Sequence, residues 1–157
     1  MGRIKFEPID VTKKHVLQSD WKKIAMIIID GDICEYYAWF LKKRYRILLN
    51  KPLRNSHVSF INEKSLDITG DWEDIKGKWN NKKVDITLSL DVRTNAKHWW
   101  LNLPEEHNKR LTEIRDSLGL SKPFYPFHLS LGYCNELNIK HSEYIHNLIK
   151  KDLTNEE

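Results

Sequence analysis

Hydrophobic and polar positions divide this chain into short apolar runs, with turn residues between them. Residues 24–29 form an unbroken apolar run of the kind found in buried strands, and the turn residues 30–32 follow it. Apolar residues then recur at helical spacing from 33 to 49, and Pro52 predicts the end of that helix. Asp32 is the expected N-cap.

The same patterns predict the remaining elements. Strict alternation of apolar and polar residues over 84–93 predicts a strand with one core face and one polar face, which would suit the wall of a solvated groove. Further strands are predicted at 56–61, 99–103 and 127–133. Helices are predicted at 104–118, with Gly119 just beyond the end, and at 141–151. Residues 1–20 are expected to be a polar arm, and 62–83 a long loop of the kind that often forms a lid, with at most a short helix.

The element order indicates an α+β fold rather than a doubly wound sheet. A helix precedes each of the strands 56–61 and 127–133. We therefore expect one domain over residues 1–157, built as two pseudo-symmetric lobes of antiparallel sheet backed by helices, with a central groove between them.

Two of these strands contain the same short string. One reads His57-Val58-Ser59-Phe60 and the other His128-Leu129-Ser130-Leu131. In a strand, residues two apart share a face and lie roughly 6–7 Å apart. Each string therefore presents a histidine and a serine together, while its apolar pair faces the core.

Two such pairs supply what a metal-free phosphodiester site requires. One imidazole can serve as base and the other as acid, because the ordinary pKa of histidine, about 6.5, keeps both forms available near neutral pH. The two hydroxyls can donate to the phosphate oxygens. No acidic or His/Cys cluster has metal-ligand spacing, so no metal or other cofactor is expected. The alternative is that both strings belong to ordinary half-buried strands.

Composition is that of a globular domain. The chain has 157 residues, 40% hydrophobic and 31% charged, with a net charge of +4 that suits an anionic ligand without requiring one. Two cysteines make no disulfide framework, and no apolar run has the length of a membrane span or a signal core. A cytoplasmic location without membrane association is the expectation.

The paired strings resemble those of the two-histidine (2H) phosphoesterase superfamily, whose members cleave cyclic phosphates and RNA-like linkages without a metal. The segments EYYAWFLKKRYRILLNKPLRNSHVSF, HWWLNLPEEHNKRLTEIRDSLGL and YPFHLSLGY look like those of the phage anti-CBASS cyclic-oligonucleotide phosphodiesterases. The likeness runs from about Ile24 to Tyr133 and is weak over 62–83. Many relatives have threonine where this chain has serine, a change that keeps the hydroxyl donor.

The resemblance implies a catalytic set of His57, Ser59, His128 and Ser130. It also implies a hydrolase that opens cyclic di- or trinucleotide second messengers of bacterial defence, in the cytoplasm of an infected bacterium. The implied partner is this cyclic oligonucleotide substrate; no long nucleic acid, membrane or cofactor is implied.

Candidate substrate-binding residues follow from position and chemistry. Trp72 and Trp79 lie in the predicted loop, where a base-stacking role is considered, and Lys76 between them could face a phosphate. Tyr133, just past the second string, could close the groove or pack. Core positions are favoured for Tyr36, Tyr37, Trp39 and Phe40 and for at least one of Trp99 and Trp100.

Three other functions stay open from sequence. A 2H enzyme could act on RNA 2′,3′-cyclic phosphate ends or on 2′–5′ oligoadenylate instead. A non-catalytic module could bind and sequester nucleotides, although binding alone does not need two acid–base groups. A structural α+β domain without a small ligand is the fourth interpretation. Turnover and nucleotide binding distinguish among these functions.

Overall fold

The fold is taken from a computed structural model that describes residues 2–7, 22–50, 56–89, 91–123, 126–135 and 138–155. The described residues form an α+β fold with one seven-stranded antiparallel sheet of order β4-β1-β2-β3-β7-β6-β5 and four α-helices. The strands are β1 (Gly2–Phe6), β2 (Lys22–Ile29), β3 (His57–Lys64), β4 (Lys83–Val84), β5 (Val92–Thr94), β6 (His98–Asn102) and β7 (His128–Tyr133).

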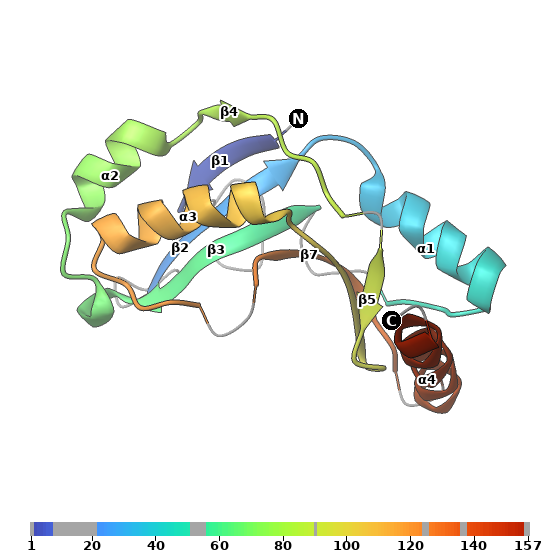
Figure 1. The fold of residues 1–157 in the computed structure, drawn as a ribbon. Helices are drawn as coiled ribbons and strands as arrows, with labels where there is room; N and C mark the ends of the chain where they lie inside the picture. The colour runs from blue at the N-terminus through green and yellow to red at the C-terminus, as the bar shows by residue number, and fades with distance from the viewer. Residues whose placement is uncertain are drawn as a thin grey trace.

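The helices lie at two places along the sheet. They are α1 (Ile33–Tyr45), α2 (Trp72–Trp79), α3 (Glu105–Ser117) and α4 (Ile139–Asn155), with a short 3-10 helix at Ser65–Asp67. Figure 1 shows α3 lying across β2 and β3, with α2 beyond it, while α1 and α4 lie at the other end beside β5. None of the described helices is long and apolar enough to cross a membrane.

The core lies on the face of the sheet that α3 covers. Leu111, Ile114 and Leu118 of α3 and its C-terminal turn are buried there, as their helical spacing predicts. They pack in one cluster with Ile27 of β2 and Val58 of β3. This packing leaves the opposite face of β3 and β7 to polar side chains.

The predicted polar arm is partly wrong. Residues 2–6 form strand β1, which pairs antiparallel with β2 along its whole length, and Ile4 and Phe6 are buried. The alternation of apolar Ile4 and Phe6 with polar Arg3 and Lys5 is the signal for this strand. The rest of the arm, residues 8–20, lies outside the described residues.

The strand predicted over 84–93 is also wrong. Only its ends are strands: β4 pairs with β1 at one edge of the sheet, and β5 pairs with β6 at the other. The described residues between them, 85–89, belong to no strand, although the Ser89 backbone N–H donates to the Asn102 carbonyl oxygen at 3.0 Å. Val84 is buried, and Ile86 and Leu88 are partly buried against the core, so burial of every second residue arises without a continuous strand.

The predicted loop 62–83 is largely regular structure. Strand β3 continues to Lys64, and the short 3-10 helix and α2 follow. Helix α2 begins after Asp71, whose carboxylate accepts a hydrogen bond from the Asp74 backbone N–H, a capping interaction.

Helix α1 ends earlier than Pro52 suggests. It stops at Tyr45 because Arg46 takes the left-handed conformation, with φ of 57°, and its backbone N–H closes the last turn. Asp32 occupies the N-cap position without a side-chain capping bond. On α1, Tyr36 and Trp39 are each 56% exposed, so the core positions favoured for these two residues are wrong.

Candidate functional site

The two histidine-serine strings lie side by side at the centre of the sheet. Strands β3 and β7 pair antiparallel with Val58 opposite Leu129. This register places His57 opposite Ser130 and Ser59 opposite His128. Residues facing each other in an antiparallel pair have Cβ atoms about 4.5–5.5 Å apart. The four predicted catalytic side chains therefore gather from both halves of the chain into one cluster, the motif cluster.

Burial confirms which way each string faces. Val58 and Leu129 are fully buried, and Phe60 and Leu131 are 2% and 1% exposed. The serines of both strings are exposed and the histidines half-buried. The apolar positions anchor both strands to the core, so the motif cluster lies on the opposite, accessible face.

Both strands carry a β-bulge at the same place. Ser59 pairs with Met26 but Ile61 pairs with Ala25, so Phe60 is the extra residue on β3. On β7, Ser130 pairs with Trp100 and Gly132 with Trp99, so Leu131 is the extra residue. A bulge bends the strand and redirects its side chains, and bulges are common beside active sites. The two halves of the motif cluster thus share a local irregularity as well as a sequence.

Arg115 of α3 supports the bulge on β3. Its guanidinium donates from Nη1 to the carbonyl oxygen of Phe60 at 2.9 Å and to the Glu63 carboxylate at 2.9 Å. Nη2 donates to the carbonyl of Ser121 at 2.7 Å, and the side chain is 4% exposed. A buried charged donor therefore fixes the backbone just after Ser59.

The His128 ring is oriented by its neighbours. Its Nδ1 lies 2.9 Å from the carbonyl oxygen of Pro126, and since a carbonyl only accepts, Nδ1 carries the proton. Nε2 is then the nitrogen that exchanges a proton with a ligand. The Trp100 ring meets the imidazole edge-to-face at 6.1 Å between ring centroids.

Basic side chains flank the motif cluster on both sides. On β1, Arg3 pairs with Ile28, which in turn pairs with His57. On β5, Arg93 pairs with Trp100, which pairs with Ser130. Residues paired across strands share a face, so both arginines lie two strands from the cluster, on its face. At about 4.8 Å per strand, each backbone is roughly 10 Å away. Arg93 is exposed, whereas the Arg3 guanidinium donates to the Asn81 carbonyl oxygen at 3.2 Å.

Three predicted binding residues lie elsewhere. Trp72 is 7% exposed and packs on Phe6 with ring centroids 5.1 Å apart. Phe6 also meets Phe60, so this contact belongs to the core face, opposite the motif cluster. A base-stacking role for Trp72 is therefore wrong.

Trp79 and Lys76 belong to the same helix, α2. Lys78 and Lys82 lie over the Trp79 ring, at 5.6 and 5.0 Å from its centroid. Lys76 forms an ion pair with Glu7 at 2.7 Å, and Glu7 also binds Lys23 at 3.1 Å. Neither residue is brought to the motif cluster.

This ion pair changes the titration of both groups. Burial alone would raise the pKa of Glu7, but the hydrogen bonds and charges of Lys76 and Lys23 outweigh it and hold that pKa below its ordinary value. The hydrogen bond to Glu7 raises the pKa of Lys76. Lys76 is thus a charged structural partner near neutral pH.

Tyr133 does lie on the face of the motif cluster. It pairs with His98 of β6, two residues before Trp100, and is 40% exposed. Its backbone also pairs with Asn50. Tyr133 therefore lies at the end of the surface that the cluster occupies.

Sequence reasoning did not assign Trp100, Asn102 or Arg93 to the site. The pairings of β6 place Trp100 opposite Ser130 and Asn102 opposite His128. Alternation within His98–Asn102 was a usable signal, because buried Trp99 and Leu101 leave Trp100 and Asn102 on the other face.

The start of α1 contacts the backbone of β7 at Ser130. The Cys34 thiol lies 3.4 Å from the carbonyl oxygen of Ser130. Burial raises the pKa of Cys34, so the group is a neutral thiol near neutral pH and donates to that carbonyl.

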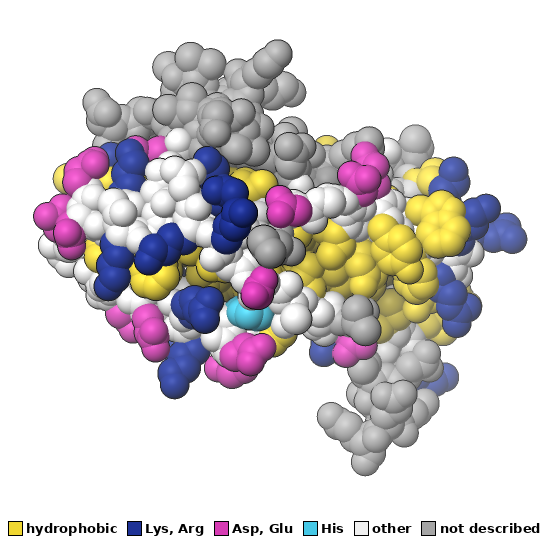
Figure 2. Space-filling model, turned by 90° about the horizontal axis from the view of Figure 1, so that it is seen from above, with side chains coloured by type: hydrophobic (Ala, Val, Ile, Leu, Met, Phe, Trp, Pro, Cys, Tyr) yellow, Lys and Arg dark blue, Asp and Glu magenta, His cyan; other side chains and the backbone are white. Residues whose placement is uncertain are grey.

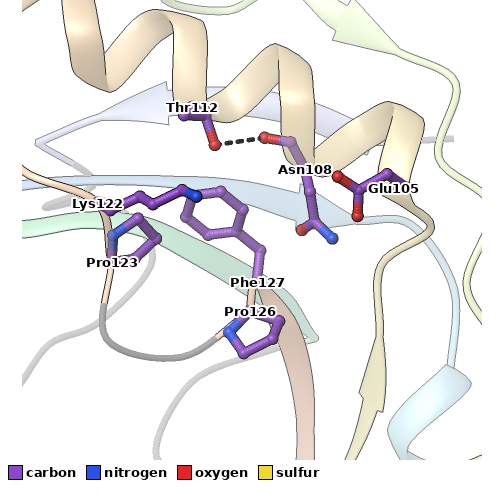
Figure 3. Close-up of a pocket in the computed structure, with 7 residues that line it drawn as sticks. All are labelled: Glu105, Asn108, Thr112, Lys122, Pro123, Pro126 and Phe127. Carbon is purple, nitrogen blue, oxygen red and sulfur yellow. Dashed lines mark hydrogen bonds between the residues drawn. The ribbon is translucent and has the colours of Figure 1, made fainter.

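A separate hollow of about 330 Å³ lies beside α3 (Figure 3). Glu105, Asn108 and Thr112 come from the helix, and Lys122, Pro123, Pro126 and Phe127 from the segment before β7. Thr112 donates to the Asn108 carbonyl, as the dashed line shows. None of the four motif side chains lines this hollow.

The surface seen from above is mixed in character. Figure 2 shows acidic and basic side chains interspersed over one half, and hydrophobic side chains gathered over the half that contains α1. Tyr36 and Trp39 of α1 are among the exposed hydrophobic residues, with ring centroids 6.1 Å apart.

Comparison with known proteins adds no relative. No protein-family model matches the chain, and neither the curated proteins nor the solved structures give a match. Within the described part of the chain, no group of three or more His, Cys, Asp or Glu side chains is placed to hold a metal ion.

Proposed function

We propose that this protein is a phosphodiesterase of the 2H type, which opens 3′–5′ linkages of cyclic di- or trinucleotides by imidazole acid–base catalysis. The observation that carries the proposal is the antiparallel pairing of Val58 with Leu129, since it sets His57 and His128 diagonally across one exposed cluster. The exposed Arg93, two strands from the cluster on the β5 side, suits a substrate with several phosphates.

The proposal includes a two-lobed arrangement. Strands β4, β1, β2 and β3 would form one lobe and β7, β6 and β5 the other. Among the described residues, β3 and β7 are in register at one pair, whereas β2 and β3 pair over seven positions. The matching bulges after Ser59 and Ser130 support a local twofold relation between the lobes.

In the proposed reaction, a neutral imidazole accepts the proton of the substrate's 2′-hydroxyl. The 2′-oxygen attacks the adjacent phosphorus in line, the bond to the 5′-oxygen breaks, and the second, protonated imidazole gives its proton to that oxygen. The products are a strand end with a 2′,3′-cyclic phosphate and a free 5′-hydroxyl. Ser59 and Ser130 donate to the non-bridging oxygens, where negative charge develops.

The hydrogen bond of His128 to Pro126 serves this chemistry. It fixes one tautomer and one ring orientation, and it stabilises the imidazolium that forms when Nε2 takes a proton. Either histidine can begin as the base, because the register gives the two histidines equivalent positions, each opposite a serine of the other strand.

The cyclic-nucleotide substrate class rests on the sequence resemblance to the phage anti-CBASS phosphodiesterases. An enzyme of that class, working in the host cytoplasm, would remove the second messengers that activate bacterial CBASS defence. The mechanism itself requires only a 2′-hydroxyl beside a 3′-phosphodiester.

A substrate panel tests the proposal. The purified protein is incubated in EDTA with 3′,3′-cyclic GMP-AMP, a cyclic trinucleotide and a 2′,3′-cyclic mononucleotide, and products are identified by chromatography and mass. We expect opening of a cyclic oligonucleotide, abolished in His57→Ala and His128→Ala. His98→Ala is the matched control, since His98 is an exposed histidine of β6.

The other outcomes separate the remaining functions. Turnover of the mononucleotide alone would favour processing of RNA ends. Nucleotide binding without turnover would indicate a sequestering module. If neither binding nor turnover is found, with EDTA or with added metals, both strings are ordinary strand sequence.

A further inference from the structure

Strand β6 presents a flat aromatic side chain beside the motif cluster. Trp100 is half-buried, whereas its neighbours Trp99 and Leu101 are fully buried on the core face. It pairs directly with Ser130, and its ring meets that of His128 edge-to-face. A group joined to a phosphate at Ser130 would therefore lie over or beside this indole.

Asn102 holds the indole in place. The Trp100 Nε1–H donates to Asn102 Oδ1 at 3.0 Å, so the only polar atom of the indole is satisfied. What remains of Trp100 is an apolar ring whose orientation is fixed. Because Oδ1 is the acceptor in this bond, the amide Nδ2 of Asn102, opposite His128, keeps donors for a ligand.

Arg93 lies on β5, the strand on the outer side of β6. It pairs with Trp100, lies on the same face, and is exposed. A guanidinium beside an indole can bind a phosphate or stack on a base. Aromatic ring, amide donors and cation together match the three parts of a nucleotide: base, sugar and phosphate.

The other side of the motif cluster differs. There, Ser59 and His57 pair with Met26 and Ile28 of β2, and Met26 is fully buried. The strings are symmetric, but their neighbouring strands are not. Of the four residues that pair with the motif residues on the flanking strands, Trp100 on β6 is the aromatic one.

We propose that Trp100, Asn102 and Arg93 form a nucleoside-binding subsite on the β6 side of the motif cluster. The base stacks on Trp100, Asn102 binds the sugar or base edge, and Arg93 binds the flanking phosphate. This assignment rests on the proposed function for its orientation toward the reacting phosphodiester, and its binding test is independent of turnover.

Binding is measured by calorimetry with the deoxydinucleotide d(ApA), which lacks the 2′-hydroxyl and cannot react by the proposed route. Trp100→Ala should weaken binding about 5- to 150-fold, the range for loss of one stacked base. Trp100→Phe keeps a ring and should recover most of the affinity. Trp39→Ala removes an exposed tryptophan on α1 and should bind like wild type.

A kinetic comparison gives a second readout. 2-Hydroxypropyl 4-nitrophenyl phosphate reacts by the same internal attack but has no base. The ratio of kcat/KM for ApA to that for this ester should fall at least 5-fold in Trp100→Ala. In Arg93→Gln, binding of d(pApAp), which carries a flanking phosphate on each side of the linkage, should lose part of its salt dependence.

The two proposals fail in different ways. If Trp100→Ala binds d(ApA) as tightly as wild type, or wild type does not bind it, the subsite is overturned, whatever the enzyme hydrolyses. If Trp100-dependent binding is found but no substrate turns over, the subsite stands and the phosphodiesterase proposal fails.

Discussion

Replacement of Arg115 by methionine tests how α3 supports the motif strand. Methionine keeps much of the buried stem but removes the guanidinium that donates to Phe60, Glu63 and Ser121. Because Phe60 is the bulged residue after Ser59, the substitution withdraws a donor from the backbone beside the motif cluster.

The expected cost follows from each lost partner. The Phe60 carbonyl belongs to a residue that is 2% exposed, and leaving such an acceptor unpaired costs about 1–3 kcal/mol. Ser121 is exposed and Glu63 is 31% exposed at its side chain, so both can turn to water and add about 1 kcal/mol together. The free energy of unfolding should therefore fall by about 2–4 kcal/mol.

Urea denaturation followed by circular dichroism measures this loss. With a slope of about 2 kcal/mol per molar urea, the midpoint should fall by about 1–2 M. Arg110→Met, at an exposed position of the same helix, should change stability by less than about 0.5 kcal/mol. Equal midpoints for the two variants would refute the role assigned to Arg115.

Other predictions address the serines, an ion pair and a glycine. Ser59→Ala and Ser130→Ala should each lower kcat on a cyclic dinucleotide about 10²–10³-fold, the cost of one donor to developing charge, while the threonine variants keep most activity; equal rates for alanine and wild type would contradict this. Glu7 has a folded pKa below its ordinary 4.5, so its ion pairs stabilise the fold above that pH and the contribution is lost as pH falls through the lower value. Glu7→Gln should thus lower the free energy of unfolding by less than about 1 kcal/mol at pH 7. On acidification to a pH below the folded pKa of Glu7, the variant should lose less stability than wild type, as measured by urea denaturation at the two pH values; equal losses would contradict this. Gly132→Ala should destabilise by about 1–3 kcal/mol in the same assay, because φ is 154° and a Cβ would lie 2.5 Å from the Asn50 carbonyl oxygen; an unchanged midpoint would be inconsistent with that contact.

Local patterns predicted the parts of the fold that are decided locally. The apolar run 24–29 corresponds to β2, and the alternation in the two histidine strings corresponds to β3 and β7. Helix α3 lies between Pro104 and Gly119, the residues that predicted its two ends. In each, the buried face can be read from nearest neighbours in sequence. The coarse class, α+β with an antiparallel sheet, follows from their order.

The failures have a common physical origin. The apolar alternation over 84–93 indicates burial of every second side chain, and a segment outside any strand can bury them as a strand does. Trp72 looks solvent-facing in a polar segment, but its partner Phe6 lies far away in sequence. Which side chains surround the motif cluster depends on strand pairing, so Trp100 and Arg93 emerge only once β5, β6 and β7 are in register.

The central claim is that two imidazoles share the proton transfers at one exposed cluster. The pH dependence of kcat/KM on a cyclic dinucleotide tests it most directly, in wild type and in His57→Ala and His128→Ala. We expect a bell-shaped profile in wild type, with rates about 10²–10⁴-fold lower and one limb lost in each variant. A variant that keeps both limbs at near wild-type rate would contradict the account.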